Sequence, residues 1–415
     1  MSQERIQPRP YLKLLLLTAV LGLVSAVITF LFIVLVHEGQ TIVWEQIARS
    51  VGLPAPIFTL LVCTIGGLIV GVLVKIFGDH SGIFAELMAE FGHTGRFNYR
   101  HAPGIVVTAL ASLIAGGSLG PEAPLADACG SLGTWTSDKL HLEEKETRAL
   151  GFSGLSGMLA AFITSPFGGA LLGLESARAG ISYPWTLFPS LVASAFATVA
   201  FVMLSGSYFG TLYSFPDYQP RFTDLLLAVP LGLIGALAGA IFIIVFKQLR
   251  QIMQPLNKHL IVRGLIGGLG LGIAGALLPL TLFSGETQTL EVIDHAAEFG
   301  AVTLIALALA KLFITTLCLA TGWKGGYIFP TMFAGAALGM AAHLIFPAIP
   351  EAVAVAATMA GTMVATMKAP IFSALFVMVL VQTETSPVIA IAVIVGALAT
   401  ARVSMMNARK ASASK

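Results

Sequence analysis

Long runs of apolar residues, separated by short polar segments, dominate the chain and predict membrane-spanning helices. Residues 14–36 carry no charge, form too long a run for the core of a signal peptide, and precede no small-residue cleavage site. We therefore expect this first helix to stay in the mature protein. Further uncharged runs could each supply one or two spans: 57–74, 102–121, 149–174, 179–216, 225–246 and 264–285.

The second half of the chain is divided more finely. Ionisable residues interrupt it at Lys311, Lys324, His343, Lys368 and Glu384, leaving runs of about 12 to 18 residues. Such runs are too short for straight spans, which need about 20 residues. This pattern predicts short, tilted or half-crossing helices.

Composition supports an integral membrane protein and excludes several other classes. Of 415 residues, 56% are hydrophobic and only 11% are charged, and the net charge is +2. So small a charge gives no reason to expect a nucleic-acid partner. Cysteine occurs at three widely spaced positions in apolar runs, Cys63, Cys129 and Cys318, and forms no CxxC pair. We therefore expect these cysteines to be packing residues, and we expect no metal site. No cofactor motif occurs in the sequence.

The two ends of the chain are basic. By the positive-inside bias, these charges place both ends in the cytoplasm of a cell whose inner membrane holds the protein. We expect no soluble domain at either end. The residues concerned are Arg5, Arg9, Lys13, Arg402, Arg409, Lys410 and Lys415.

An internal repeat is indicated by two ordered self-matches. A shift of 209 residues lays Gly116-Gly117-Ser118-Leu119-Gly120-Pro121 over Gly325-Gly326-Tyr327-Ile328-Phe329-Pro330. A shift of 204 then lays Gly157 and Pro166 over Gly361 and Pro370. Chance alignment of small residues is the alternative, because such residues abound at membrane helix contacts. We predict two related halves, residues 1–215 and 216–415, with a transport site near their interrupted segments.

The interrupted segments suggest what the site would bind. In each, Gly-Gly precedes a proline by four residues, which suits a chain that enters the membrane irregularly and restarts as a helix at Pro121 or Pro330. The free amides of a helix start attract an anion without a formal cation. Ser81, before Gly82, could donate its hydroxyl to that anion, or it could simply cap its own helix.

These motifs resemble those of the CLC chloride channels and proton-coupled anion antiporters. Ser81-Gly82-Ile83 is similar to the family's G-S-G-I-P, and Gly117 to Pro121 stands where the family has G-R-E-G-P. The run from Lys311 through Thr315 and Gly322 to Pro330 resembles K-x-x-x-T leading into G-G-x-F-x-P. Phe162 to Pro166, with Gly169 and Glu175, resembles F-N-A-P-x-x-G with its acidic end.

The resemblance implies an all-α polytopic fold of two inverted repeats with short, broken helices. It also implies a homodimer with one pore in each subunit, carrying chloride or a similar anion through the lipid bilayer. The anion site would be formed by Ser81, Gly82, Ile83, Gly117, Leu119, Gly120, Gly326, Tyr327, Ile328 and Phe329.

Departures from the family pattern bear on proton coupling. Leu119 stands where the resemblance implies a gating glutamate, and Ser176 where it implies an internal proton carrier, with Glu175 one residue early. No tyrosine follows Tyr327 to serve as the family's pore tyrosine. We therefore expect a short prokaryotic member with a passive or weakly coupled anion pathway. The alternative is an antiporter in which Glu122 or Glu175 titrates.

Three ionisable residues at membrane depth permit two interpretations each. Glu122 is either a gate or a helix-start carboxylate with its own partner. Lys324 either concentrates anions in a vestibule or is an interfacial lysine. Lys311 either steers ions or pairs with a buried carboxylate.

Two rival functions also fit parts of the sequence. Gly154-Leu155-Ser156-Gly157 matches the G-x-S-G of rhomboid-type intramembrane proteases, with His343 as the partner of the serine. Broken helices in repeated halves would also suit a transporter of an organic solute. We favour a protein that is not an enzyme, because G-x-S-G is short and small residues are common here.

Overall fold

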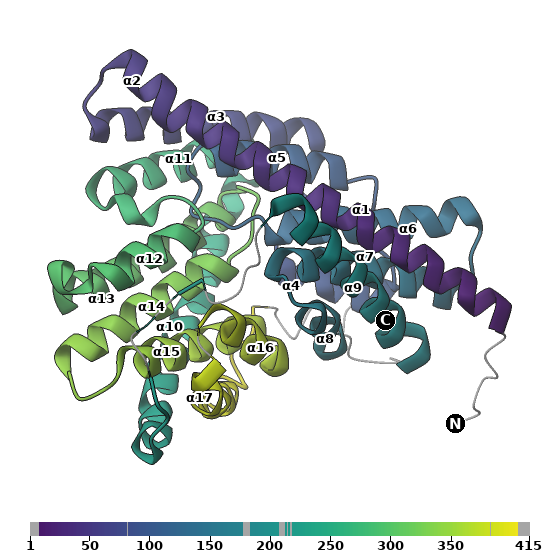
Figure 1. Ribbon diagram of the computed structural model, residues 1–415. Coiled ribbons are helices and arrows are strands. Elements are labelled where there is room, and N and C mark those ends of the chain that lie inside the picture. Colours follow the sequence, from purple (N-terminus) through teal and green to yellow (C-terminus); the bar gives the residue numbers. More distant parts are fainter. Residues whose placement is uncertain are drawn as a thin grey trace. The chain divides into compact units, whose positions relative to one another are not determined.

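The computed structural model describes residues 8–80, 82–176, 183–206, 212–213, 215, 218–381 and 383–405. Over these residues the regular elements are helices (Figure 1), and the only extended pairing is one isolated bridge, Gly120–Gly326. The first half contains α1 Pro8–Thr41, η1 Ile42–Ile47, α2 Ala48–Val51, α3 Ala55–Phe77, α4 Phe84–Thr94, α5 Ala102–Ile114, α6 Glu122–Leu140, α7 Glu144–Ile163, α8 Pro166–Ser176, η2 Tyr183–Leu187 and α9 Phe188–Ser205. The second half contains α10 Phe222–Met253, η3 Gln254–Lys258, α11 Leu260–Leu277, η4 Pro279–Thr281, α12 Glu286–Asp294, α13 Ala296–Ala320, α14 Ile328–Ile345, α15 Glu351–Met367, α16 Pro370–Leu380, η5 Thr383–Thr385 and α17 Ser386–Ala399.

Within the described chain, seven helical segments are long and apolar enough to cross a membrane. They are Arg9–Val51, Ala55–Phe77, Pro184–Ser205, Phe222–Lys258, Leu260–Leu277, Ala296–Ala320 and Ile328–Ile345. Several shorter apolar helices accompany them, including α5 and α15–α17. The expected helical, multi-pass membrane protein is thereby confirmed.

Two expected interruptions in the second half are wrong. Lys311 does not end an apolar run but lies inside α13, a helix of 25 residues whose one non-helical residue is Gly300. A charge can stay within an apolar helix where other parts of the chain bind it, as Lys311 shows below. His343 likewise lies inside α14, which is long enough to cross a membrane, whereas α15, α16 and α17 are short as expected.

The chain forms two compact units that draw on both halves of the sequence. Unit 1 comprises residues 1–34, 87–103 and 124–209, and unit 2 comprises residues 35–86, 104–123 and 210–415. These units follow spatial contacts and do not coincide with the boundary at 215/216 that the repeat suggests. That boundary concerns duplicated sequence, and it stays a prediction.

In unit 1, α7 is the central element. Its residues from Ala149 to Ile163 are all buried, and α8 and α9 pack against it. Leu14 and Leu21 of α1 form a cluster with Ala149 and Leu150 of α7. The helix approaches α9 closely enough for the Ser194 hydroxyl to donate to the Ser156 carbonyl at 3.2 Å.

In unit 2, glycine allows helix backbones to touch. α3 and α11 lie side by side (Figure 1), and an ideal Cβ at Gly67 would lie 2.5 Å from the Gly264 carbonyl oxygen. α15 is buried from Ala352 to Thr366 and packs on α10, α14 and α17. Small residues at fixed spacing are the usual means of close helix association in lipid, where apolar burial provides little attraction between helices.

Candidate functional site

The two interrupted Gly-Gly segments meet in unit 2. The Gly120 amide donates to the Gly326 carbonyl at 2.9 Å, and the Gly326 amide donates to the Gly120 carbonyl at 2.6 Å. A glycine at positive φ opens the first segment, Gly116 at 89°, and another lies three residues before the second, Gly322 at 94°; a side chain at either would strain the turn. The two segments that the sequence repeat identified are therefore in contact in the fold.

A helix begins after the first segment and within the second. α6 starts at Glu122, one residue beyond Pro121, and α14 starts at Ile328, two residues before Pro330. The expected restart at Pro330 is thus slightly late, because proline is tolerated within the first helical turn, where its missing amide is not needed. Both starts present N-terminal amides near the bridge.

The side chain of Glu122, which is the first residue of α6, lies at the N-terminal end of α14. Its side chain is 1% exposed, and its Oε1 accepts a hydrogen bond from the Ile328 amide at 2.6 Å. Oε2 is buried with no hydrogen-bond partner among the described residues. A Cβ at Gly120 or Gly326 would overlap the Glu122 carboxyl group, so both glycines leave the space that it fills. The partner of this helix-start carboxylate therefore belongs to another helix.

Apolar side chains enclose this junction. Leu119 is fully buried against Gly325, where an ideal Cβ would lie 2.6 Å from that of Leu119. The Tyr327 ring lies 5.4 Å from Phe242, and the Phe329 ring lies 5.9 Å from Phe376. In such surroundings, of low dielectric constant, an amide at a helix start attracts a negative charge more strongly than it would in water.

The third segment contributes only part of the expected site. Ser81 lies outside the described residues, so its expected hydroxyl contact stays a prediction. Ile83 is buried directly before α4. Gly82 packs against Lys324, because an ideal Cβ there would lie 2.9 Å from Lys324 Cδ. The structure thus brings Gly82 beside the residue that precedes Gly325.

Lys324 is buried rather than interfacial, with 5% of its surface exposed. Its Nζ lies 3.4 Å from Asp79 Oδ1 and donates to the His80 carbonyl. Arg263 Nη2 donates to Asp79 Oδ2 at 2.6 Å. Burial by itself would raise the pKa of Asp79, but Lys324 and Arg263 outweigh it and hold the pKa below its ordinary value.

Sequence reasoning assigned no role to Arg263 or Asp79. Asp79 stood in the segment that contains Ser81, and Arg263 stood at the edge of an apolar run. An unexplained charge beside a membrane segment was the available signal. Their pairing spans 184 residues and has no local pattern.

Lys311 serves the framework of the site. Its Nζ, fully buried, donates to the carbonyls of Leu282 and Phe283 at 2.8 Å and to those of Thr281 and Leu280 at 3.2 and 3.4 Å. The Phe283 amide in turn donates to the Gly116 carbonyl at 3.0 Å. Backbone carbonyls, rather than the expected carboxylate, are therefore its partners.

Two other residues were candidates for a functional role, Glu175 and His343. Glu175 lies in α8 and is partly exposed. His343, the suggested protease partner, has its Nδ1 2.7 Å from the Ile349 carbonyl and its Nε2 3.4 Å from Glu351. Both ring nitrogens are thus engaged by neighbours on or beside their own helix.

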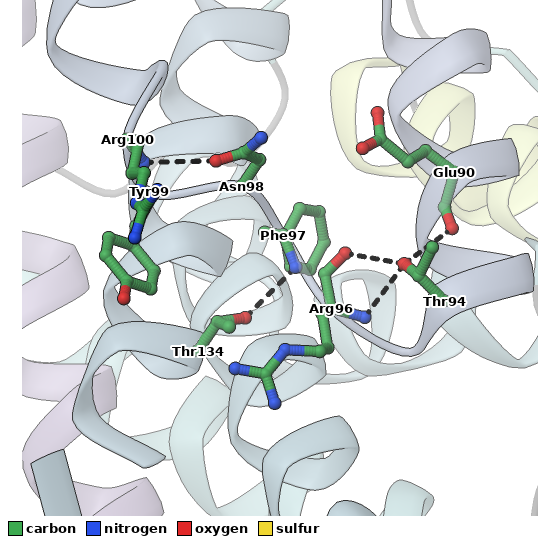
Figure 2. Close-up of a pocket in the computed structure, with 8 residues that line it drawn as sticks. All are labelled: Glu90, Thr94, Arg96, Phe97, Asn98, Tyr99, Arg100 and Thr134. Atoms are coloured by element: carbon green, nitrogen blue, oxygen red, sulfur yellow. Dashed lines mark hydrogen bonds between the residues drawn. The ribbon is translucent and has the colours of Figure 1, made fainter. Parts of the chain in front are cut away.

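A separate surface pocket of about 380 Å³ lies in unit 1. Figure 2 shows its lining, from the end of α4, the following loop and α6: Glu90, Thr94, Arg96, Phe97, Asn98, Tyr99, Arg100 and Thr134. Its polar groups bind one another, since the Phe97 amide donates to Thr134 at 3.0 Å and Arg96 pairs with Asp138. Across the described residues, no cluster of histidine, cysteine or acidic side chains could hold a metal ion.

The sequence matches a known protein family and several of its members. The family model described as voltage gated chloride channel matches residues 66–402. A protein of Escherichia fergusonii with the provisional name ion-transport protein YfeO is 27% identical over 358 residues, covering 84% of each chain. The protein of the same name from Escherichia coli O1:K1 is 28% identical over the same length.

Solved structures share the fold. A CLC-type fluoride/proton antiporter superposes with a TM-score of 0.82 at 19% identity, covering 97% of this chain and 98% of its own. A slow cyanobacterial Cl⁻/H⁺ antiporter gives 0.83 at 22% identity, covering 96% and 95%. The family consists of channels and transporters rather than enzymes. Because the family model matches most of its length, this chain belongs to the voltage gated chloride channel (CLC) family of anion transport proteins.

Proposed function

We propose that the protein carries a small inorganic anion across the bacterial inner membrane, with chloride as the first candidate, and that Glu122 gates the pathway. One observation carries this proposal, the 2.6 Å hydrogen bond from the Ile328 amide to Glu122 Oε1. The Glu122 carboxylate accepts a hydrogen bond from the helix-start amide to which a permeating anion would otherwise bind. Anion and carboxylate therefore compete for one place.

Protonation is the way to end that competition. A neutral carboxyl group is attracted less strongly to a helix-start amide, and it no longer repels an incoming anion. The unpartnered Oε2 is an available place for the proton. Leu119 can neither compete with an anion nor bind a proton, which is why its presence suggested a passive pathway. In this proposal Glu122 does both, so the flux depends on protons.

The test uses purified protein in chloride-loaded liposomes, with a potassium ionophore to set the voltage. Chloride efflux and internal pH are recorded together over a range of pH. We expect wild-type efflux to increase as pH falls, because a larger fraction of Glu122 is then neutral. We expect Glu122→Gln to conduct at every pH without proton movement.

Other outcomes discriminate among the alternatives. If Glu122→Gln keeps the wild-type pH dependence, Glu122 only braces α14 and Glu175 becomes the next carboxylate to test. Glu175→Gln is the matched control, and we expect it to behave like wild type. Absence of chloride and fluoride efflux would favour the organic-solute transporter. Fluoride is included because one structural relative is described as a fluoride/proton antiporter.

The assembly and orientation belong to the same proposal. We propose a homodimer in which each subunit has its own pathway, with Gly117, Gly120, Gly326, Tyr327, Ile328 and Phe329 around the anion and with both chain ends in the cytoplasm. The fold likeness and the basic ends support this arrangement.

A further inference from the structure

Two buried cations in unit 2 converge on a single carboxylate. Arg263, in the first turn of α11, and Lys324, in the loop before α14, have side chains that are each 6% exposed. Both bind Asp79, whose side chain is 38% exposed. The carboxylate thus bridges the two cations, as a small anion placed between them would.

The cluster has an excess of positive charge. Two cations bind one carboxylate, and their other hydrogen bonds go to neutral acceptors: Arg263 donates to the Asn257 side chain at 2.8 Å, and Lys324 donates to the His80 carbonyl. Glu86 also attracts Lys324 electrostatically, but it is itself paired with Arg250, so the excess of one positive charge remains. Arg263 Nε is buried without a hydrogen-bond partner in the part of the chain that the structure describes. Buried charges are normally paired, so this excess calls for a further anion.

The cations are held in place while the carboxylate is the exposed member. Ideal Cβ atoms at Gly82 and Gly322 would lie 2.9 Å from Lys324 Cδ and 2.7 Å from Arg263 Nη2, so both glycines make room for the cations. Asp79 instead follows Gly78, at a φ of 95°, in the loop after α3. Asp79 is therefore the group that can leave the cluster.

We infer that Arg263 and Lys324 form a second site for the transported anion, and that Asp79 is a tethered anion that fills this site until the mobile anion displaces it. This inference rests on the proposed function, since the occupant is the anion that the protein carries. Lys324 lies two residues before Gly326, whose amide helps to form the bridge beside Glu122. An anion held by the cation pair is thus close in the chain to the junction it must pass.

The first readout is the chloride concentration that gives half-maximal flux in liposomes. We expect Asp79→Asn to lower it about two- to fivefold, because a partly exposed competing ion pair contributes little energy. Lys324→Gln and Arg263→Gln should raise it. Glu45→Gln is the matched control, since it removes an exposed carboxylate that is paired with Arg49 and not with either cation, and it should leave the value unchanged.

The second readout does not need transport. In detergent, the melting temperature of Asp79→Asn should be lower than that of wild type in potassium gluconate and should recover in potassium chloride, because chloride can replace the lost carboxylate. An equal loss in both salts, together with unchanged half-saturation, would show that Asp79 is only a structural counter-ion and would overturn the inference.

The two readouts distinguish a failure of the proposed function from a failure of the second anion site. If wild type carries no chloride but Asp79→Asn is still rescued by chloride, the proposed function fails and the cation pair stands as an anion site. If Glu122→Gln behaves as expected and Asp79→Asn ignores chloride, only the second site is rejected.

Discussion

At the residue scale, the buried charges of unit 2 follow a common rule with different outcomes. Lys311 is bound by four backbone carbonyls, Glu122 accepts from the Ile328 amide, and Lys324 is bound by a carboxylate and a carbonyl. A charge fully supplied with partners supports the fold, because removing it leaves those partners unsatisfied. A charge that keeps a free atom, as Glu122 does, is the better candidate for a group that changes state.

Lys311→Met should therefore destabilise the protein by about 3 kcal/mol, since several buried carbonyls lose their donor. Phe283, which has a φ of 58°, should be loosened along with them. Thermal or denaturant unfolding in detergent would measure this change. Lys258→Met is the control, because Lys258 is exposed and its loss should change stability by no more than about 0.5 kcal/mol. Equal effects of the two substitutions would contradict the assigned role.

At the element scale, glycine positions decide how closely helices approach. Gly235 of α10 faces the backbone of α15, and a Cβ there would overlap the Thr358 carbonyl oxygen. Backbone atoms cannot rotate away as a side chain can, so the helices themselves would have to separate. This contact differs from those of Gly120 and Gly326, whose neighbour is the movable Glu122 carboxyl group.

Gly235→Ala should accordingly lower the free energy of unfolding by about 1–3 kcal/mol through overpacking. The helical Gly92 of α4 has no atom within 4 Å of an ideal Cβ and provides the comparison. Gly92→Ala should be neutral or slightly stabilising, because alanine favours a helix over glycine by about 1 kcal/mol. Melting temperatures of the two variants measured side by side would test the argument, and a stable Gly235→Ala protein would refute it.

At the scale of the whole molecule, assembly and topology can be tested directly. We expect light scattering of the detergent-purified protein to give twice the 43.4 kDa mass of one chain after subtraction of detergent. A mass of one chain would refute the homodimer. This measurement needs no assumption about transport.

Orientation is tested by reporter fusions at each end of the chain. A fluorescent protein that matures only in the cytoplasm should be bright at both ends, and alkaline phosphatase, active only outside, should be inactive at both. The physical reason is the basic charge of both ends, which favours retention on the cytoplasmic side. An active phosphatase at either end would show that the basic residues do not determine the topology.

The sequence by itself determined the local features of this protein. Apolar runs predicted the spans, because hydropathy is a property of a continuous segment, and the expected family is confirmed by its match over residues 66–402. The glycine and proline pattern located both interrupted segments, because these residues limit what a backbone can do locally. Lys311 was misread as an interruption, since its four carbonyl partners lie some 30 residues away.

Only the tertiary structure decided which groups meet. Glu122 and Ile328 are 206 residues apart, and Lys324 and Asp79 are 245 apart. No periodicity relates such residues, because their contact depends on the packing of all the helices between them. The sequence left Glu122 open between gate and helix-start carboxylate, whereas the fold supplies the amide on another helix that makes competition with an anion physically possible.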